Sequence, residues 1–349
     1  MWIVVPTIGF LVAAAYSWRM LSFVSSPADR QGQEVFFEVQ NGASFSHVAR
    51  ELRERGLITD ARLFTWLARF LGQTSRLKVG EYKLNTNMYP RQILFELTSG
   101  RSVIYALTIP EGHNIYEIRD QLNSMWAGRG EEFIQLATNK EFIQQLTHMP
   151  LPNLEGYLFP ETYSISKHTP ARTLINQMYE SFRTNIEQAN KEPKVTMALR
   201  EQVILASMIE KETGAPEERP LISSVFHNRL KKGMRLQSDP TILYGSLVVT
   251  GVVKKNIVKK DLSIPTPYNT YTVKALPLGP IANPGRDALW AAVHPADSNY
   301  LYFVSRNDGT HVFTENYKDH ERAVRDYQIN RKAREGRSWR ELKSRKARN

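Results

Sequence analysis

The 349-residue sequence contains no cysteine, which excludes thiol catalysis, disulfide bonds, thiolate zinc sites and a lipoprotein attachment point. It also lacks a His-Glu-x-x-His zinc motif, a glycine-rich phosphate loop and the Gly-x-Ser-x-Gly elbow of serine hydrolases. His311 and His320 are too far apart in the sequence to suggest a local metal site. We therefore expect an activity that needs no metal and no cofactor.

Acidic residues are scarce at the C-terminus. The net charge is +11, and residues 331–349, with nine Lys or Arg and two Glu, carry seven of those charges. The rest of the chain is nearly balanced. A basic tail attracts anionic lipids, wall polymers or nucleic acid alike, and the simpler interpretation is a solvated terminus. We assign this tail no specific partner and expect no nucleic acid.

One uncharged apolar run stands at the N-terminus. Residues 2–18 carry no charge, and at about 1.5 Å per residue the run, extended to residue 24, crosses most of a ~30 Å hydrocarbon layer. Tyr16 and Trp18 suit a membrane interface. A cleaved signal peptide is the alternative, because residues 13–15 are alanines, but no basic region precedes the run. We predict a single-pass anchor in the cytoplasmic (inner) membrane over residues 1–24, with the remaining chain on the periplasmic or extracellular side.

Residues 34–103 form a predicted small α+β subdomain. The expected elements are strands at 35–39 and 82–84 and helices from Ser44 onward, at 60–71 and at 89–98. The order strand, helix, helix, strand resembles a LysM-like glycan-binding module. A generic α+β packing domain is the alternative.

Residues 104–330 are predicted to form a larger, mainly helical catalytic domain, so the fold class is α+β. A proline-rich polar stretch at 265–285 is typical of an ordered loop that serves a site. Segments 300–304 and 310–313 flank Asn-Asp-Gly and predict a β-hairpin. The helices are expected near 130–147, 170–190, 197–213, 217–231 and 315–334.

Glu212 is the candidate catalytic residue. At about 100° per residue, Leu205, Met208 and Ile209 form one apolar stripe, and Glu212 falls near its centre. Burying an unpaired carboxylate is expensive, so the group responds by raising its pKa. Its place in the last helical turn, ahead of the expected Gly214 cap, disfavours the anion further. A carboxyl that keeps its proton near neutral pH is suited to protonating a glycosidic oxygen.

The same pattern allows a purely structural role. Glu212 could form a salt bridge with Arg219 or Arg229 on the next predicted helix. Pairing of Glu212 with Glu210 as two catalytic carboxylates is less favourable, because two residues apart on a helix their side chains diverge by about 200°.

Several long motifs, in order along the chain, resemble the endolytic murein transglycosylase family (MltG or YceG-like). The similarity extends from the anchor to about residue 330 and leaves out the basic tail. The motifs are Glu155-Gly-Tyr-Leu-Phe-Pro-Glu-Thr162, Val203-Ile-Leu-Ala-Ser-Met-Ile-Glu-Lys-Glu-Thr-Gly214, Glu218-Arg219, Ser224-Val-Phe-His-Asn-Arg-Leu-Lys-Lys-Gly-Met-Arg-Leu-Gln-Ser-Asp-Pro-Thr241, Thr266-Pro-Tyr-Asn-Thr-Tyr271 and Leu276-Pro-Leu-Gly-Pro-Ile-Ala-Asn-Pro-Gly285.

This resemblance implies a membrane-anchored enzyme that cuts glycan strands between N-acetylmuramic acid and N-acetylglucosamine and leaves 1,6-anhydro ends. It implies Glu212 as the catalytic residue, and it suggests an enzyme that terminates glycan elongation near wall synthases, with penicillin-binding proteins as partners. The sugar-binding candidates around Glu212, in an elongated groove, are Gln237, Asp239, Thr241, Tyr268, Asn269, Thr270 and Tyr271, with Glu161 as a further candidate.

The sequence allows two other interpretations. Residues 237–241 could owe their composition to turn chemistry, since Asp before Pro240 is common in turns. The whole chain could also be a non-catalytic, membrane-tethered peptidoglycan-binding scaffold in which Glu212 is structural. Products with 1,6-anhydro ends would distinguish the enzyme from this scaffold.

Overall fold

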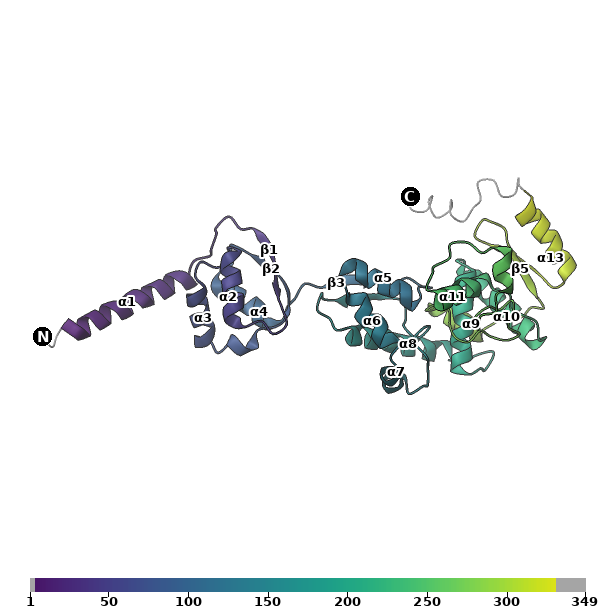
Figure 1. The fold of residues 1–349 in the computed structure, drawn as a ribbon, viewed down its shortest axis with the longest axis horizontal. Helices are drawn as coiled ribbons and strands as arrows, with labels where there is room; N and C mark the ends of the chain where they lie inside the picture. The colour runs from purple at the N-terminus through teal and green to yellow at the C-terminus, as the bar shows by residue number, and fades with distance from the viewer. Residues whose placement is uncertain (1–3, 331–349) are drawn as a thin grey trace. The chain divides into compact units, whose positions relative to one another are not determined.

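The computed structural model describes residues 4–330 as a mixed α+β fold with three two-stranded sheets (Figure 1). The basic tail predicted at 331–349 lies outside the described residues, as do residues 1–3 of the predicted anchor. Within the described part, no helix meets the combined length and apolarity needed to cross a membrane. The predicted anchor therefore stays a prediction.

The chain divides into two compact units. Unit 1 comprises Met1–Leu107 together with Ser164–Pro170, and unit 2 comprises Thr108–Tyr163 together with Ala171–Asn349. The elements of unit 1 are α1 (Val4–Val24), β1 (Glu34–Val39), α2 (Phe45–Glu54), α3 (Ala61–Phe70), β2 (Gly80–Asn85) and α4 (Pro90–Ser99).

Local sequence signals fix the helix starts in unit 1. At the start of α2, the Ser44 hydroxyl accepts a hydrogen bond from the backbone N–H of His47 at 3.2 Å. The Asp60 carboxylate accepts the Arg62 amide at 2.8 Å before α3. These N-caps satisfy amide groups that have no partner inside the helix. Strands β1 and β2 pair antiparallel in the register Glu34 with Asn85 through Val39 with Gly80.

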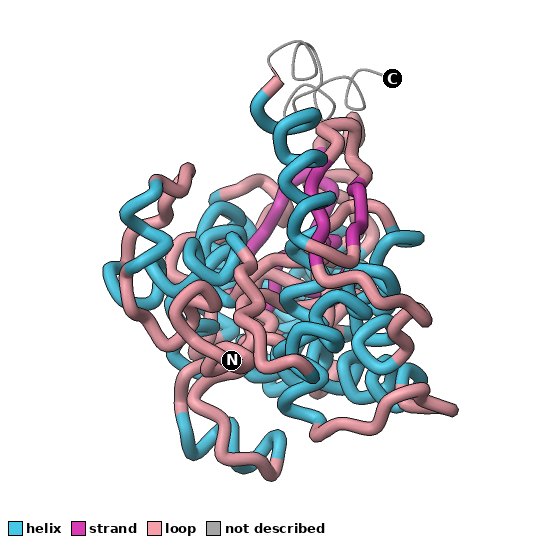
Figure 2. Tube along the Cα trace, turned by 90° about the vertical axis from the view of Figure 1, so that its right-hand side faces the viewer, coloured by secondary structure: helices cyan, strands magenta, loops and turns pink. Residues whose placement is uncertain are grey.

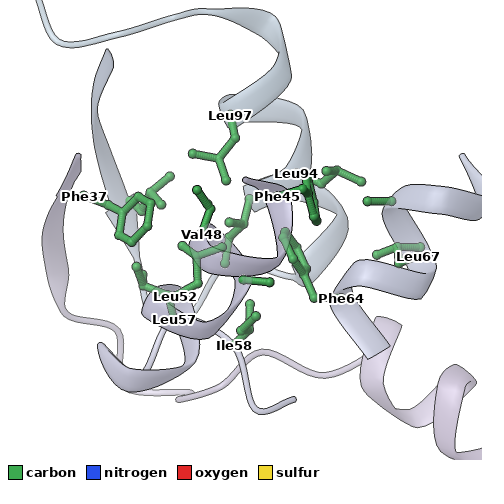
Figure 3. Close-up of a cluster of buried hydrophobic side chains, with 14 of the residues drawn as sticks. Phe37, Phe45, Val48, Leu52, Leu57, Ile58, Phe64, Leu67, Leu94 and Leu97 are labelled. Carbon is green, nitrogen blue, oxygen red and sulfur yellow. The ribbon is translucent and has the colours of Figure 1, made fainter. Parts of the chain in front are cut away.

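The core of unit 1 lies between this sheet and its helices (Figure 3). Phe37 of β1 and Leu67 of α3 enter the apolar cluster from opposite sides. Phe45 and Phe64 stack at its centre, with ring centroids 5.6 Å apart. Phe23 near the end of α1 is also buried in this cluster, so the last turns of α1 are part of the unit.

Unit 2 is mainly helical. Helix α9 lies at its centre and contacts α10, α11 and α12. Figure 2 shows the hairpin of β5 and β6 in magenta beside α13, which packs against both strands. Strands β3 (Tyr105–Thr108) and β4 (Thr162–Ile165) each include residues of both units. The elements of unit 2 are α5 (Ile115–Met125), α6 (Arg129–Ala137), α7 (Lys140–Thr147), α8 (Ala171–Ala189), α9 (Leu199–Glu212), α10 (Arg219–Lys231), α11 (Asp239–Thr250), α12 (Arg286–Val293), β5 (Tyr302–Ser305), β6 (His311–Thr314) and α13 (Tyr317–Val324).

Some predicted elements were wrong. The single helix expected at 130–147 is two helices, because Asn139 caps α7 by accepting the Phe142 amide at 2.7 Å. Helices α11 and α12 were not predicted. In α11, Pro240 was interpreted as a turn signal, although proline is favoured in a first helical turn. Helix α12 follows directly on the proline-rich stretch that was interpreted as a loop. The last helix ends earlier than expected, with α13 followed by a short π-helical turn over Arg325–Ile329.

Candidate active site

Helix α9 carries Glu212 as its last residue. The side chains from Gln202 to Ile209 are all buried, because other helices surround this part of α9. The expectation of a single apolar stripe was therefore too narrow. Glu210, expected to point away from the core, has only 6% of its side chain exposed. The helix also ends on Thr213 in an extended conformation rather than on a Gly214 cap.

Glu212 is half-buried and receives a hydrogen bond from the Ser238 hydroxyl, with Oγ 2.5 Å from Oε1. Burial raises the pKa of Glu212 to about 7, and the negative charge of Asp239 acts in the same direction. The Ser238 hydrogen bond and the positive charge of Arg229 oppose this rise, since both stabilise the carboxylate. The net result is a carboxyl that exchanges its proton near neutral pH.

Ser238 is a site residue that sequence reasoning missed. It occupies the N-cap position of α11, where serine ordinarily accepts an amide hydrogen bond from the first turn. Here its side chain makes no such cap and points to Glu212 instead. Its backbone is fixed by neighbours: its amide donates to Thr270 Oγ1 at 2.9 Å, and its carbonyl accepts from Thr241 Oγ1 at 2.6 Å. The signal available in the sequence was a serine directly before Asp-Pro.

Five of the predicted sugar-binding residues gather around Ser238. The buried Thr241 and Thr270 hydroxyls are 2.9 Å apart and join the start of α11 to the proline-rich loop. Gln237 has a left-handed backbone conformation, with φ of 50°, and its backbone N–H donates to the Thr270 carbonyl at 3.2 Å. The Tyr271 hydroxyl donates to Asp239 Oδ1 at 2.6 Å. Thr241 and Thr270 are thus buried and support the backbone of the site, whereas Asp239 and Tyr271 lie near its surface.

The other three predicted sugar-binding residues make their contacts with groups other than Ser238. Asn269 is buried, and its amide group donates to backbone carbonyls of residues 261, 262 and 264, so it shapes the loop. Tyr268 is buried edge-to-face against Tyr244, with ring centroids 5.0 Å apart. Glu161 is exposed and accepts a hydrogen bond from Ser181 of α8 at 3.2 Å.

The two arginines considered as salt-bridge partners of Glu212 are engaged with other groups. Arg219 pairs with Glu210 at 3.2 Å, with Asp287 at 3.3 Å and with Glu111 at 3.5 Å. Across the described residues, no ion pair within 4.0 Å involves Glu212.

Arg229 is buried and donates to three backbone carbonyls, those of residues 235, 236 and 301. Its positive charge acts on Glu212 only through a longer-range electrostatic attraction. The purely structural interpretation of Glu212, as a salt-bridged residue, therefore does not hold for these two arginines.

Similarity to known proteins identifies the family of this chain. The model of the YceG-like family matches residues 37–326, which is most of the sequence. The chain belongs to the YceG-like family. A protein of Bacillus subtilis named endolytic murein transglycosylase is 33% identical, over 84% of this chain and 84% of its own length. A protein of the same name from Streptococcus pneumoniae strain D39 is 31% identical over 86% of this chain, which spans only 60% of that longer relative.

A solved structure also resembles this YceG-like chain. The crystal structure of a YceG-like protein from Listeria monocytogenes aligns with a TM-score of 0.56 and 30% sequence identity. The alignment covers 83% of this chain and 99% of the other. The similarity therefore extends across nearly the whole of the crystallised chain.

Glu155, in the first of the family motifs, is a further buried carboxyl of this YceG-like chain, and its role does not follow from the sequence. Glu155 is 1% exposed, and burial raises its pKa to about 8. Its Oε2 accepts from the Tyr244 hydroxyl at 2.9 Å and from the Ile115 amide at 3.2 Å, and its Oε1 accepts from Asn283 at 3.3 Å. Because these partners come from α5, α11 and the loop before α12, Glu155 acts as an internal connector.

A surface hollow lies along α8, lined by residues that include Tyr179, Phe182 and Ile186. Glu212 is not among its lining residues. The elongated groove expected around Glu212 therefore stays a prediction.

Proposed function

We propose that this chain is an endolytic lytic transglycosylase of peptidoglycan in which Glu212 is the catalytic acid and base. The observation that carries the proposal is the state of Glu212: a half-buried carboxyl at the end of α9 with its pKa raised to about 7. Membership in the YceG-like family, and relatives named endolytic murein transglycosylase, support the same activity.

The reaction needs only one carboxyl. Protonated Glu212 donates its proton to the glycosidic oxygen as the bond from that oxygen to C1 of N-acetylmuramic acid breaks. The resulting carboxylate then accepts the proton of the C6 hydroxyl of the same sugar, whose oxygen closes on C1. The products are a 1,6-anhydro end and a free N-acetylglucosamine hydroxyl, and Glu212 regains its proton. No water is consumed, unlike in hydrolysis by a pair of carboxylates.

Neighbouring groups support this cycle. Asp239 keeps negative charge near Glu212 and so favours the protonated acid, while Ser238 stabilises the carboxylate formed after proton donation. Gln237, Asp239 and Tyr271 are the side chains we assign to sugar contacts, because they are more exposed than the buried Thr241 and Thr270 beside Ser238.

The placement of the enzyme in the cell is part of the same proposal. The N-terminal run over residues 1–24 anchors the chain in the cytoplasmic membrane, with unit 2 outside. Unit 1 serves as a LysM-like glycan-binding module, supported by its order of β1, α2, α3 and β2. A membrane position brings the active site to nascent strands and to wall synthases such as penicillin-binding proteins.

The test compares Glu212→Gln with Glu201→Gln, an exposed glutamate in the first turn of the same helix. Glu212→Gln should stay folded and bind sacculi but release no 1,6-anhydro muropeptides, as read by chromatography and mass spectrometry. Glu201→Gln should retain full activity.

Each contrary result has a defined meaning. Retained activity in Glu212→Gln would refute its catalytic role. Products with reducing ends would indicate hydrolysis instead, with Asp239 available to activate water. Binding by the wild-type chain without any product would support the non-catalytic scaffold.

A further inference from the structure

One face of α3 in unit 1 combines exposed aromatic rings with arginines. At about 100° per residue, positions 62, 66, 69 and 70 fall on the same side of the helix. Trp66 is 54% exposed and Phe70 is 85% exposed. Arg62 and Arg69 are exposed between them, and neither forms an ion pair with another described residue. We call these four residues the α3 face.

Helix α1 is fixed beside the α3 face. The rings of Tyr16 and Trp66 meet edge-to-face with centroids 6.4 Å apart. Arg19 forms an ion pair at 2.9 Å with Asp60, the N-cap of α3. Phe23, one turn further on, is buried in the core of the unit. These contacts hold α3 at a defined level along α1.

That level coincides with the aromatic end of the N-terminal run. Trp18 is 76% exposed and lies about 3 Å along the helix axis from Tyr16. Tyr and Trp are enriched where a membrane helix meets the headgroups, and arginines beside aromatic rings are typical of helices that lie on anionic bilayers. The α3 face therefore carries the residue types of an interface at the height where the anchor would leave the membrane.

We propose that the α3 face lies on the anionic lipid headgroups of the membrane, so that unit 1 is seated on the bilayer rather than tethered above it. The proposal rests on the membrane anchor of the proposed function. In this position Trp66 and Phe70 enter the headgroup layer, and Arg62 and Arg69 bind lipid phosphates.

A second copy of the chain is a poorer occupant of this face. Pairing by two-fold symmetry would bring the same patch of both copies together. Arg62 and Arg69 of each copy would then meet like charges, and the α3 face contains no acidic residue to offset them. An anionic lipid surface complements the same arginines.

The absence of cysteine in the sequence allows single-site labelling of the full chain. We would attach a fluorophore to Phe70→Cys and, as a matched control, to Phe36→Cys, which replaces another exposed phenylalanine of unit 1. Phe36 alternates with the inward-pointing Phe37 on β1, and Figure 3 shows Phe37 entering the core opposite α3. Both proteins are reconstituted in phosphatidylcholine and phosphatidylglycerol vesicles that contain headgroup nitroxide lipid.

We expect emission to be quenched at position 70 and unchanged at position 36. Replacing phosphatidylglycerol by phosphatidylcholine should reduce the quenching at 70. The double variant Arg62→Gln with Arg69→Gln should reduce it equally, whereas Arg50→Gln with Arg53→Gln, two exposed arginines of α2, should leave it unchanged.

The outcomes separate this proposal from the anchor on which it rests. Failure of the chain to float with vesicles would overturn both. Flotation with equal emission at positions 70 and 36 would overturn the seated α3 face and leave the anchor intact. A disulfide dimer formed by unlabelled Phe70→Cys under mild oxidation would assign the face to a second copy and would overturn the lipid proposal. Quenching relieved by soluble glycan fragments would assign the face to glycan and would likewise overturn it.

Discussion

In the variant Ser238→Ala, Glu212 loses the hydroxyl that stabilises its ionised form at 2.5 Å. A hydrogen bond to a charged group contributes about 1.5 to 3 kcal/mol, and about 1.36 kcal/mol corresponds to one pKa unit. Because Glu212 is half-buried, we take the lower end of this range. The pKa of Glu212 should then rise by about one unit from its value of about 7.

The sign of the effect on activity follows from the role of Glu212. As an acid it must carry its proton at the start of the reaction, so activity is present below its pKa and is lost as the pH rises through it. The alkaline limb of the pH profile, near pH 7 in the wild type, should therefore move upward in Ser238→Ala. The maximal rate should fall, because the carboxylate formed after proton donation loses its hydrogen bond.

The assay measures release of 1,6-anhydro muropeptides from sacculi at pH values on both sides of 7. Ser246→Ala, two turns further along α11, is the matched control and should keep the wild-type limb. Melting curves would verify that both variants remain folded. An unmoved or downward-shifted limb in folded Ser238→Ala would refute the assigned control of Glu212 by Ser238.

Three other changes test the surrounding network. Asp239→Asn removes a negative charge that raises the pKa of Glu212, so its alkaline limb should move downward, opposite to Ser238→Ala; an upward shift would contradict this. Because burial raises the pKa of Glu155 from 4.5 to about 8, its contribution to stability is complete below pH 4.5 and is lost as the pH rises to about 8. The melting temperature of the wild type should therefore fall over this pH range. In Glu155→Gln this fall should disappear, and an unchanged fall would mean that another group causes it. Arg219→Met leaves the Glu210 carboxylate buried without its partner, and urea unfolding should show a loss of about 3 to 5 kcal/mol; adding Glu210→Gln should recover part of it, and an undiminished loss would mean that the pair is not the cause.

The sequence predicted the elements whose signals are local. The N-cap Ser44 begins a helix where expected, and Asn-Asp-Gly joins the strands of the predicted hairpin. Residues whose role depends on the fold could not be found in this way. Ser238 meets Glu212 from 26 positions away, and Glu155 meets Tyr244 from 89 positions away. Because each pair joins two separate segments of the chain, the spacing of residues within one helix cannot predict it.

The same limit applies to Glu212 itself. The premise of one apolar stripe on α9 was too simple, because the helix is enclosed on several sides from Gln202 to Ile209. The expected consequence, a raised pKa, agrees with the structure, and burial is its main cause as expected: Glu212 lies at the end of α9, partly shielded from water and away from any ion-pair partner among the described residues.

Glu210 and Glu212 show how one helix end can hold two carboxyls with different chemistry. Glu210 is neutralised by Arg219 and also accepts the Gly285 amide at 3.0 Å, so its charge is committed to joining α9, α10 and the loop before α12. Glu212, two residues later, accepts a hydrogen bond from the neutral hydroxyl of Ser238, at the start of α11, and forms no ion pair within the part of the chain that the structure describes. If Arg219 were within reach of Glu212, it would hold that carboxyl ionised and remove the proton that the reaction needs. The pairing of Arg219 with Glu210 therefore fixes the architecture of the site and, by the same contact, leaves Glu212 able to carry a proton.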